Sequence, residues 1–369
     1  MSAPEISTFL ESRVAAGDFP GYAFRVARGE TPLAEGYGGL AMREPREIPV
    51  AADTIWDVAS LTKPFVTAPL AAALCAAGLF TLDESLRGIF PDLPDDKAAL
   101  TLSLLLTHTA GLPAWAPVYL FAKDKAALYE FLCGVEFVHP PGTAILYSDL
   151  GYLLAGLVVE RLAGQGLNDL FDQHFARPLN LRDSGFVPAF IARRRIAASE
   201  AGNAHEAEMI AGNPLWTARA AEHPASHELL WGEVHDGNAR ALGGVAGHAG
   251  LFGTVAELNR LAAHLVTSSS RALWLSPRAD DGKNRRTLSC VLQSTADSAG
   301  HAILPGTAIG HAGFTGVSWH YDPARDRHYF LMTNRTHPHP SKADMQAVRR
   351  EFLRLASALP DDRRPGASA

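Results

Sequence analysis

The stretch SLTKPF at residues 60–65 opens a helical pattern that continues to Ala77. Ser60 and Lys63 lie nearly one helical turn apart, so the ammonium of Lys63 can approach the hydroxyl of Ser60. The start of a helix also favours negative charge that develops on the serine. Pro69 falls inside the run and predicts a kink or a break in the helix. The motif indicates a nucleophilic serine, although a surface pair on one helix is the more common origin of so short a pattern.

A second motif, YSD at residues 147–149, follows the turn PPGT at 140–143 and precedes a helical pattern that begins near Gly151. A tyrosine whose pKa is lowered by neighbouring cations can take a proton from a serine and return it to a leaving group. Asp149 would then face the substrate or orient the lysine. The alternative is a tyrosine that packs in the core and an aspartate that caps the helix.

The third motif is HAGF at residues 311–314, just ahead of a predicted hairpin. Glycine in a strand lets another backbone approach closely, so Ala312 and Gly313 are candidates for substrate binding. The backbone N–H groups of Phe314 and Ser60 would together form an oxyanion hole for acyl transfer. The alternative is a core histidine in a strand that contains glycine.

Strands are expected near both ends of the chain and helices in its middle. The expected strands are Tyr22–Val26, Leu33–Tyr37, Gly316–Tyr321 and His328–Thr333. This order predicts an α+β fold, an antiparallel β-sheet flanked by helices with an inserted, mostly helical lobe. We expect residues 1–59 and 250–359 to form the sheet-and-helix lobe. Residues 60–249 would form the helical lobe with long cleft loops, and residues 360–369 a disordered tail.

Composition narrows the classes of partner. The chain has 369 residues, 47% of them hydrophobic, and 33 Lys and Arg against 39 Asp and Glu, a formal charge of −6. It has no dense basic run, so we expect no binding to nucleic acid or to anionic membranes. A small-molecule or peptide substrate is the expected partner, and the oligomeric state stays open.

Cysteine usage and apolar runs bear on the compartment. Three widely spaced cysteines predict no disulfide framework and fit a reducing environment. The N-terminus lacks the pattern of a signal peptide, and the longest apolar stretch, Phe65–Phe80, is too short to span a bilayer. A cytoplasmic location without membrane insertion is therefore expected.

The three motifs in this order resemble the serine β-lactamases and penicillin-binding proteins, especially the class C branch and its esterase relatives. Other stretches strengthen the resemblance, which runs from about Gly21 to about Arg335. They are LLTHTAGLP at 105–113, YSDLGY at 147–152 and GGVAGHAGLF at 243–252.

The resemblance implies a β-lactamase/transpeptidase-like fold and an acyl-serine mechanism without a cofactor or a metal. In that mechanism Ser60 is the nucleophile, Lys63 is its proton partner and Tyr147 is the base. His311 occupies the catalytic position of the third motif, and the N–H of Phe314 completes the oxyanion hole.

Two positions depart from the family pattern. Asp149 stands where the class C pattern has Asn, and His311 stands where many relatives have Lys. Both changes lower the positive potential expected at the site. We therefore expect β-lactams, which carry a carboxylate, to be poorer substrates than esters, amides or peptides without one.

The polar segment GEVHDGN at residues 232–238 resembles a segment of a subgroup of these hydrolases. His235 and Asp236 are expected to line the cleft and bind substrate. The alternative is a hydrogen-bonded loop that braces the site.

Two other classes of protein stay open as alternatives. One is a non-hydrolytic penicillin-binding protein or sensor of cell-wall peptides on the same fold. The other is a metal-dependent hydrolase, because His223, His227 and His235 lie near acidic residues. However, Pro224 disfavours a helical pair of ligands, and no HExxH motif occurs.

Overall fold

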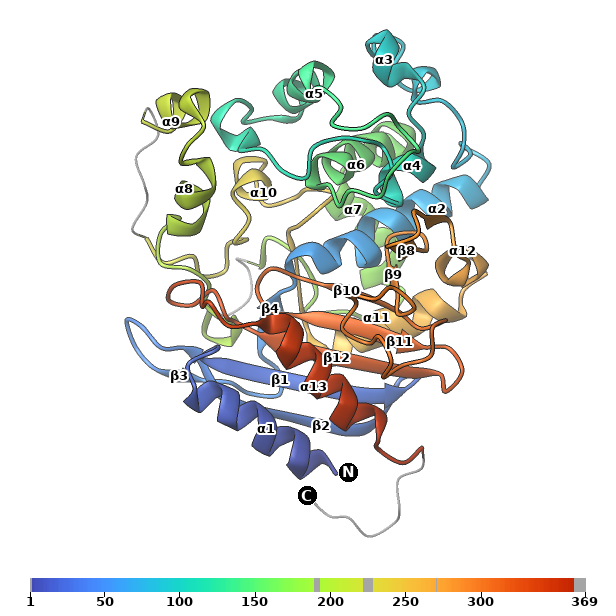
Figure 1. Ribbon diagram of the computed structural model, residues 1–369. Helices are drawn as coiled ribbons and strands as arrows, with labels where there is room; N and C mark the ends of the chain where they lie inside the picture. The colour runs from blue at the N-terminus through green and yellow to red at the C-terminus, as the bar shows by residue number, and fades with distance from the viewer. Residues whose placement is uncertain (1, 189–192, 222–227, 270, 362–369) are drawn as a thin grey trace.

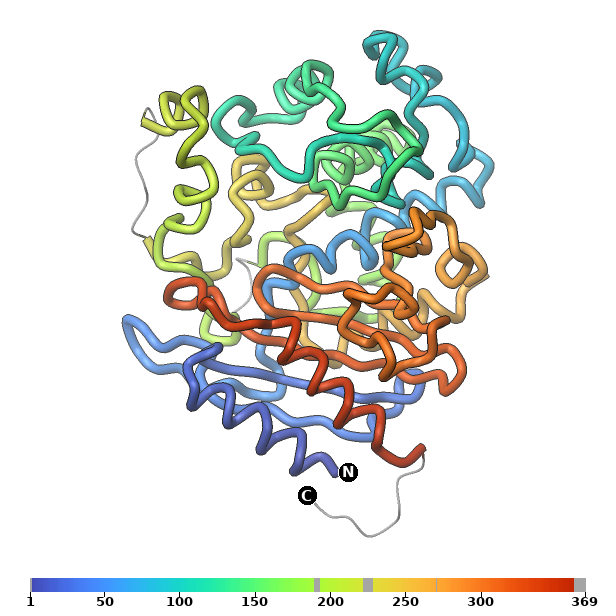
Figure 2. Tube along the Cα trace, viewed as in Figure 1, coloured from blue at the N-terminus to red at the C-terminus, as the bar shows by residue number. Residues whose placement is uncertain are grey.

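The computed structural model describes residues 2–188, 193–221, 228–269 and 271–361 (Figures 1 and 2). Its main feature is a large antiparallel sheet with the strand order β3-β2-β1-β12-β11-β10-β9-β8-β7. The strands are β1 (Gly21–Arg28), β2 (Thr31–Met42), β3 (Ile48–Pro49), β7 (Ala279–Asp280), β8 (Arg285–Arg286), β9 (Val291–Leu292), β10 (Ile309–Ala312), β11 (Ser318–Asp322) and β12 (Arg327–Thr333). Because β1 pairs with β12, the two ends of the chain meet in the centre of the sheet, as predicted.

Helices cover both faces of this sheet. On one face α1 (Ala3–Ala15) and α13 (Met345–Ser357) pack against each other and against β2 and β12 (Figure 1). Phe24 and Leu331 point into this layer, whereas their neighbours point into the opposite one. This alternation is the period of two expected of strands that are covered on both sides.

The opposite face carries α11 (Val255–Thr267) and the helical lobe. The helices of that side are α2 (Ala68–Ala76), α3 (Asp95–Ala98), α4 (Leu102–Leu106), α5 (Lys125–Gly134), α6 (Asp149–Ala163), α7 (Leu167–Phe171) and α12 (Arg271–Leu275). A second sheet joins β4 (Ile55–Asp57), β6 (Leu251–Thr254) and β5 (Gly185–Phe186). One continuous apolar core runs from the main sheet into the helices. The predicted α+β fold with antiparallel strands is confirmed, while the division into two lobes stays a prediction.

The break predicted at Pro69 takes the form of a π-helical turn, Lys63–Thr67, directly before α2. Here the N–H of Ala68 donates to the carbonyl of Lys63, which extends the turn before the proline. The helical stretch Ala59–Ala76 is long and apolar enough to cross a membrane by length and composition. It is nevertheless 78% buried inside the fold, as in the core helix of a globular domain.

Part of the region expected to carry the long cleft loops is helical, since the described residues between 198 and 250 include three short α-helices. These are α8 (Ala204–Ile210), α9 (Pro214–Ala220) and α10 (Gly237–Ala241). Side chains of Asn213 and Asp236 cap the last two, so local capping makes helix where the apolar periodicity is weak. Of the predicted disordered tail, Pro360 and Asp361 are held by Arg327. The rest of that tail, 362–369, lies outside the described residues.

Candidate active site

Ser60 lies at the junction between β4 and the π-helical turn, in a single turn of 3-10 helix over Ala59–Leu61. Ala59 adopts a left-handed φ of 46°, which is strained for a residue with a side chain. The carboxylate of Asp57 accepts the N–H of Ala59 at 2.8 Å and helps to hold this conformation. The junction therefore presents a partly exposed serine on a fixed backbone.

Lys63 reaches Ser60 as the spacing predicts. Its Nζ donates to the Oγ of Ser60 at 2.9 Å and to the carbonyl of His248 at 3.1 Å, and it lies 2.7 Å from Oδ1 of Asp149. The side chain of Lys63 is completely buried. Burial alone would lower the pKa of Lys63, but the attraction of Asp149 and Tyr147 raises that pKa above its ordinary value. Lys63 is therefore held as an ammonium.

Tyr147 joins the same cluster. Its ring lies 4.9 Å from Nζ of Lys63 and stacks on His108 at 4.4 Å. Burial raises the pKa of Tyr147, and Asp149 raises it further against the pull of Lys63. The expectation of a lowered tyrosine pKa is therefore wrong, because desolvation exceeds the effect of the cation.

The third motif reaches the serine from the end of β10. A Cβ on Gly313 would lie 2.8 Å from the carbonyl oxygen of Val58, so the strand approaches the backbone just before Ser60. A turn closed by Gly316 N–H and Gly313 C=O then carries Phe314. This close approach places the segment that carries Phe314 beside the backbone that precedes Ser60.

His311 lies 6.0 Å from the ring of Tyr147 and is buried. Its Nδ1 contacts the carbonyl of Ala312 at 3.0 Å, and its Nε2 has no partner among the described residues. Burial, with the charges of Lys63 and Arg286 nearby, holds the pKa of His311 well below its ordinary value. His311 is therefore neutral at physiological pH.

Arg286 is the group that sequence reasoning missed. It is only 8% exposed, and its guanidinium lies 5.7 Å from the ring of Tyr147. Neither Nε nor Nη1 has a hydrogen-bond partner in the described part of the chain. Burial lowers the pKa of Arg286, yet an arginine stays charged at neutral pH. A cation thus enters the site from β8 rather than from position 311, so the expected loss of positive potential is incomplete.

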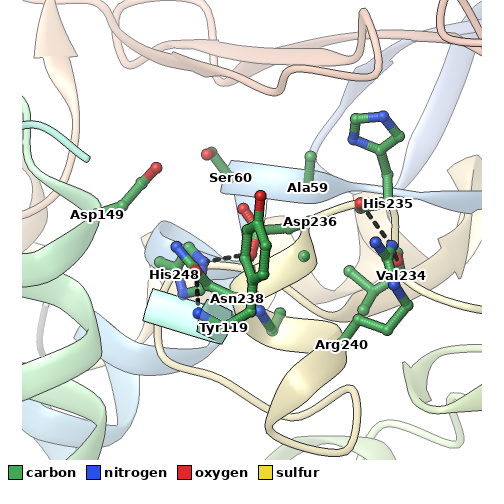
Figure 3. Close-up of polar contacts among 12 residues, drawn as sticks. Ala59, Ser60, Tyr119, Asp149, Val234, His235, Asp236, Asn238, Arg240 and His248 are labelled. Atoms are coloured by element: carbon green, nitrogen blue, oxygen red, sulfur yellow. Dashed lines mark hydrogen bonds and ion pairs between the residues drawn. The ribbon is translucent and has the colours of Figure 1, made fainter. Parts of the chain in front are cut away.

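His235 and Asp236 both lie beside the cluster but have protein partners. Figure 3 shows Ser60 between Asp149 on one side and His235 on the other. Nε2 of His235 meets Glu200 at 2.8 Å, while Oδ1 of Asp236 meets Nε2 of His248 at 2.8 Å. These contacts favour the bracing alternative, above all for His235.

The loop around His235 contacts Asp57 and Phe314, the residue whose N–H is the second candidate oxyanion donor. The backbone N–H of His235 donates to Asp57 at 2.7 Å, and its ring stacks on Phe314 at 5.3 Å. His205 stacks on Phe314 at 4.6 Å, and Nε of Arg335 donates to its carbonyl at 2.6 Å. The segment 232–238 indicated His235. No local motif marks Asp57, His205 or Arg335, because each lies far along the chain from the residue that it contacts.

Glu200→Ala tests the brace. We expect kcat to fall about tenfold with KM nearly unchanged, because His235 would lose its partner and Phe314 would shift relative to Ser60. Stability should fall by about 1–3 kcal/mol, since a buried donor is left unpaired. Glu200→Gln, which keeps an acceptor for His235, should retain most of kcat. If KM rises while kcat is unchanged, the loop binds substrate and does not brace the site.

The described residues contain no group of three or more His, Cys, Asp or Glu side chains placed to hold a metal ion. His223 and His227, which suggested a metal, lie outside those residues. The structure therefore offers no ligand set to the alternative of a metal-dependent hydrolase within the part that it describes.

Comparisons with known proteins identify a protein family and several related proteins. A model of the Beta-lactamase family matches residues 6–354. A putative D-alanyl-D-alanine carboxypeptidase of Escherichia coli (strain K12) is 28% identical over 346 residues, covering 84% of this chain and 74% of that protein. An N-acetylmuramyl-L-alanine amidase of Bacillus subtilis (strain 168) is 27% identical over 377 residues, covering 90% and 81%.

A class C β-lactamase from Rhodobacter sphaeroides superposes with a TM-score of 0.71 at 18% identity, over 96% of this chain and 99% of that one. At that identity the superposition supports the fold alone. The family match spans nearly the whole chain and confirms the resemblance that the motifs indicated. The chain belongs to the β-lactamase family.

Proposed function

We propose that this protein is a serine hydrolase that forms an acyl intermediate on Ser60 and acts on peptides, amides or esters. The observation that carries the proposal is the cluster in which Nζ of Lys63 contacts Oγ of Ser60 at 2.9 Å and lies 4.9 Å from the ring of Tyr147. A nucleophile and its proton partners within hydrogen-bond reach are the mark of covalent catalysis.

The chemistry proceeds in two halves. In the first, Tyr147 has already lost its own proton. Oγ of Ser60 attacks the carbonyl carbon, and the proton of Oγ passes to the phenolate oxygen of Tyr147. The N–H groups of Ser60 and Phe314 stabilise the oxyanion, and Tyr147 returns the proton to the leaving group. In the second, a water molecule loses a proton to Tyr147 and attacks the acyl carbon; the bond to Oγ breaks, Tyr147 returns the proton to Oγ of Ser60, and the acyl group leaves as an acid. Lys63 stays an ammonium throughout.

Arg286 points to the substrate class within this reaction. A buried guanidinium without a partner is unfavourable by several kcal/mol unless an anion pairs with it. A carboxylate on the leaving side of the scissile bond would provide two charge-assisted hydrogen bonds. The related carboxypeptidase is named for substrates that end in such a group. We therefore favour peptides with a free C-terminal carboxylate over neutral esters, which reverses the expectation drawn from Asp149 and His311.

The test is a substrate panel with detection of the intermediate. We would measure hydrolysis of a peptide ending in D-alanyl-D-alanine, its C-terminal amide, nitrocefin and p-nitrophenyl acetate, and quench each reaction for intact-mass analysis. The expected result is turnover of the substrate with a transient acyl adduct on the enzyme, located on the fragment of this chain that contains Ser60. Turnover without an adduct there would contradict the proposal. A stable adduct without turnover would favour the sensor.

A further inference from the structure

Asp149 contacts Lys63, which is the second of the two roles that the YSD motif indicated. As the first residue of α6, it donates its N–H to the carbonyl of Ala114 at 2.8 Å. Its carboxylate lies 2.7 Å from Nζ of Lys63, which is completely buried, while Asp149 itself is 18% exposed. An ion pair this short and this poorly solvated is screened weakly. Asp149 therefore acts on the charge of Lys63.

The contact also completes the surroundings of the ammonium. Nζ of Lys63 lies within 3.1 Å of three oxygen atoms, from Ser60 at 2.9 Å, His248 at 3.1 Å and Asp149 at 2.7 Å. Of these three, Asp149 alone carries a charge. An asparagine at this position would leave a buried cation whose acceptors are all neutral.

We propose that Asp149 is a positioning residue that holds Lys63 as an ammonium between Ser60 and His248 and thereby sets the pH at which Ser60 is activated. This proposal rests on the acyl-serine function proposed above. It differs from the expectation that Asp149 binds substrate, because Asp149 acts here through Lys63.

Other charged and titratable groups face the same cluster from every element around it. They are Tyr147 before α6, Tyr152 on α6, His108 after α4, Arg286 on β8, His311 on β10, Asp236 at the start of α10 and His248 before β6. All of them stay in place when Asp149 alone is changed. A shift in the pH profile can then be assigned to its charge.

The direction of the effect follows from electrostatics. Serine activation needs one proton to leave the coupled pair of Lys63 and Tyr147, and an adjacent anion makes that loss harder. Asp149 accordingly raises the pKa of Lys63 and that of Tyr147. The rate should therefore rise with pH along an acidic limb that Asp149 displaces toward alkaline pH.

The experiment is the pH dependence of acylation by p-nitrophenyl acetate in wild type and in Asp149→Asn. This ester has no N–H group that could donate to the carboxylate of Asp149. The loss of such a substrate contact therefore cannot explain a shift of the pH profile. We expect the acidic limb to move to lower pH by about one unit or more, because a charge within this distance shifts a pKa by 1–3 units. The maximal rate should fall about tenfold, since a less basic proton acceptor is less effective.

Asp149→Glu restores the charge and should return the limb toward its wild-type position. An unchanged limb in Asp149→Asn, with a rise in KM for peptide substrates only, would overturn the proposal and assign Asp149 to substrate binding. A limb that moves to higher pH would overturn it as well. Absence of any adduct on Ser60 in the wild type would refute the proposed function instead, so the two failures are distinguishable.

A second measurement keeps the test independent of the variant's folding. The chain has six lysines, so NMR with 15N-labelled lysine side chains can follow each Nζ through a titration. The resonance that Lys63→Arg removes should titrate above the other five. If it titrates below them, Lys63 is not held as an ammonium and the proposal fails.

Discussion

Ser60→Ala is expected to lower kcat/KM for every hydrolysed substrate by about 10⁴-fold or more and to remove the acyl adduct. The loss is this large because Lys63 and Tyr147 act only through the serine oxygen. Both proton partners would remain in place, since Lys63 still contacts Asp149 and His248. The measurement is steady-state hydrolysis together with intact-mass analysis of quenched reactions.

The fold should tolerate this change. Ser60 is partly exposed and its hydroxyl accepts one hydrogen bond from Lys63, so we expect stability to change by no more than about 1 kcal/mol. Ser85→Ala is a control, because it removes a hydroxyl that caps Arg87 outside the site. Its rates and adduct should match wild type. More than a small percentage of wild-type activity in Ser60→Ala would show that another group is the nucleophile.

Arg286→Ala is expected to lower kcat/KM about 100-fold for the peptide with a free carboxylate, and to leave p-nitrophenyl acetate nearly unchanged. The estimate follows from the 2–5 kcal/mol lost when one partner of a desolvated charge pair is removed. Arg286→Lys keeps the charge but not the paired geometry, so it should lose less, about tenfold. The measurement is the ratio of the two specificity constants in each variant.

A second signature accompanies the loss of selectivity. Because Nε and Nη1 of Arg286 are buried with no hydrogen-bond partner in the described part of the chain, Arg286→Met should raise the free energy of unfolding by about 1 kcal/mol or more. Arg285→Ala is the matched control, since the neighbouring arginine is 43% exposed and pairs with Asp280 at the surface. An equal loss for ester and peptide in Arg286→Ala would make Arg286 a structural residue.

The sequence predicted most of the reacting groups because their relations are local. The spacing of Ser60 and Lys63 corresponds to one helical turn, and the structure places their side chains 2.9 Å apart. The motif around Tyr147 sits before a helix, as predicted, but the side chain that caps the helix is that of Ser148 and not that of Asp149. Strands near both chain ends with helices between them indicated one antiparallel sheet with a helical insertion, because elements of one kind pack into one layer.

The remaining groups could not be predicted in this way. Arg286 enters the site because β8 pairs with β9 and β9 with β10, a chain of pairings that brings it toward His311. Asp57, Glu200 and His235 form one brace across sequence separations of 35 and 178 residues. No short pattern encodes contacts of that range.

By itself, then, the sequence indicated the order of strands and helices and the candidates for the nucleophile and its two proton partners. Only the tertiary structure decided the charge of the site. Burial raises the pKa of Tyr147, and the carboxylate of Asp149 balances the charge of the Lys63 ammonium. Arg286 adds a second cation, whose Nε and Nη1 have no hydrogen-bond partner among the described residues. Desolvation and ion pairing depend on which groups surround a side chain, and that is set by long-range packing rather than by spacing along the chain.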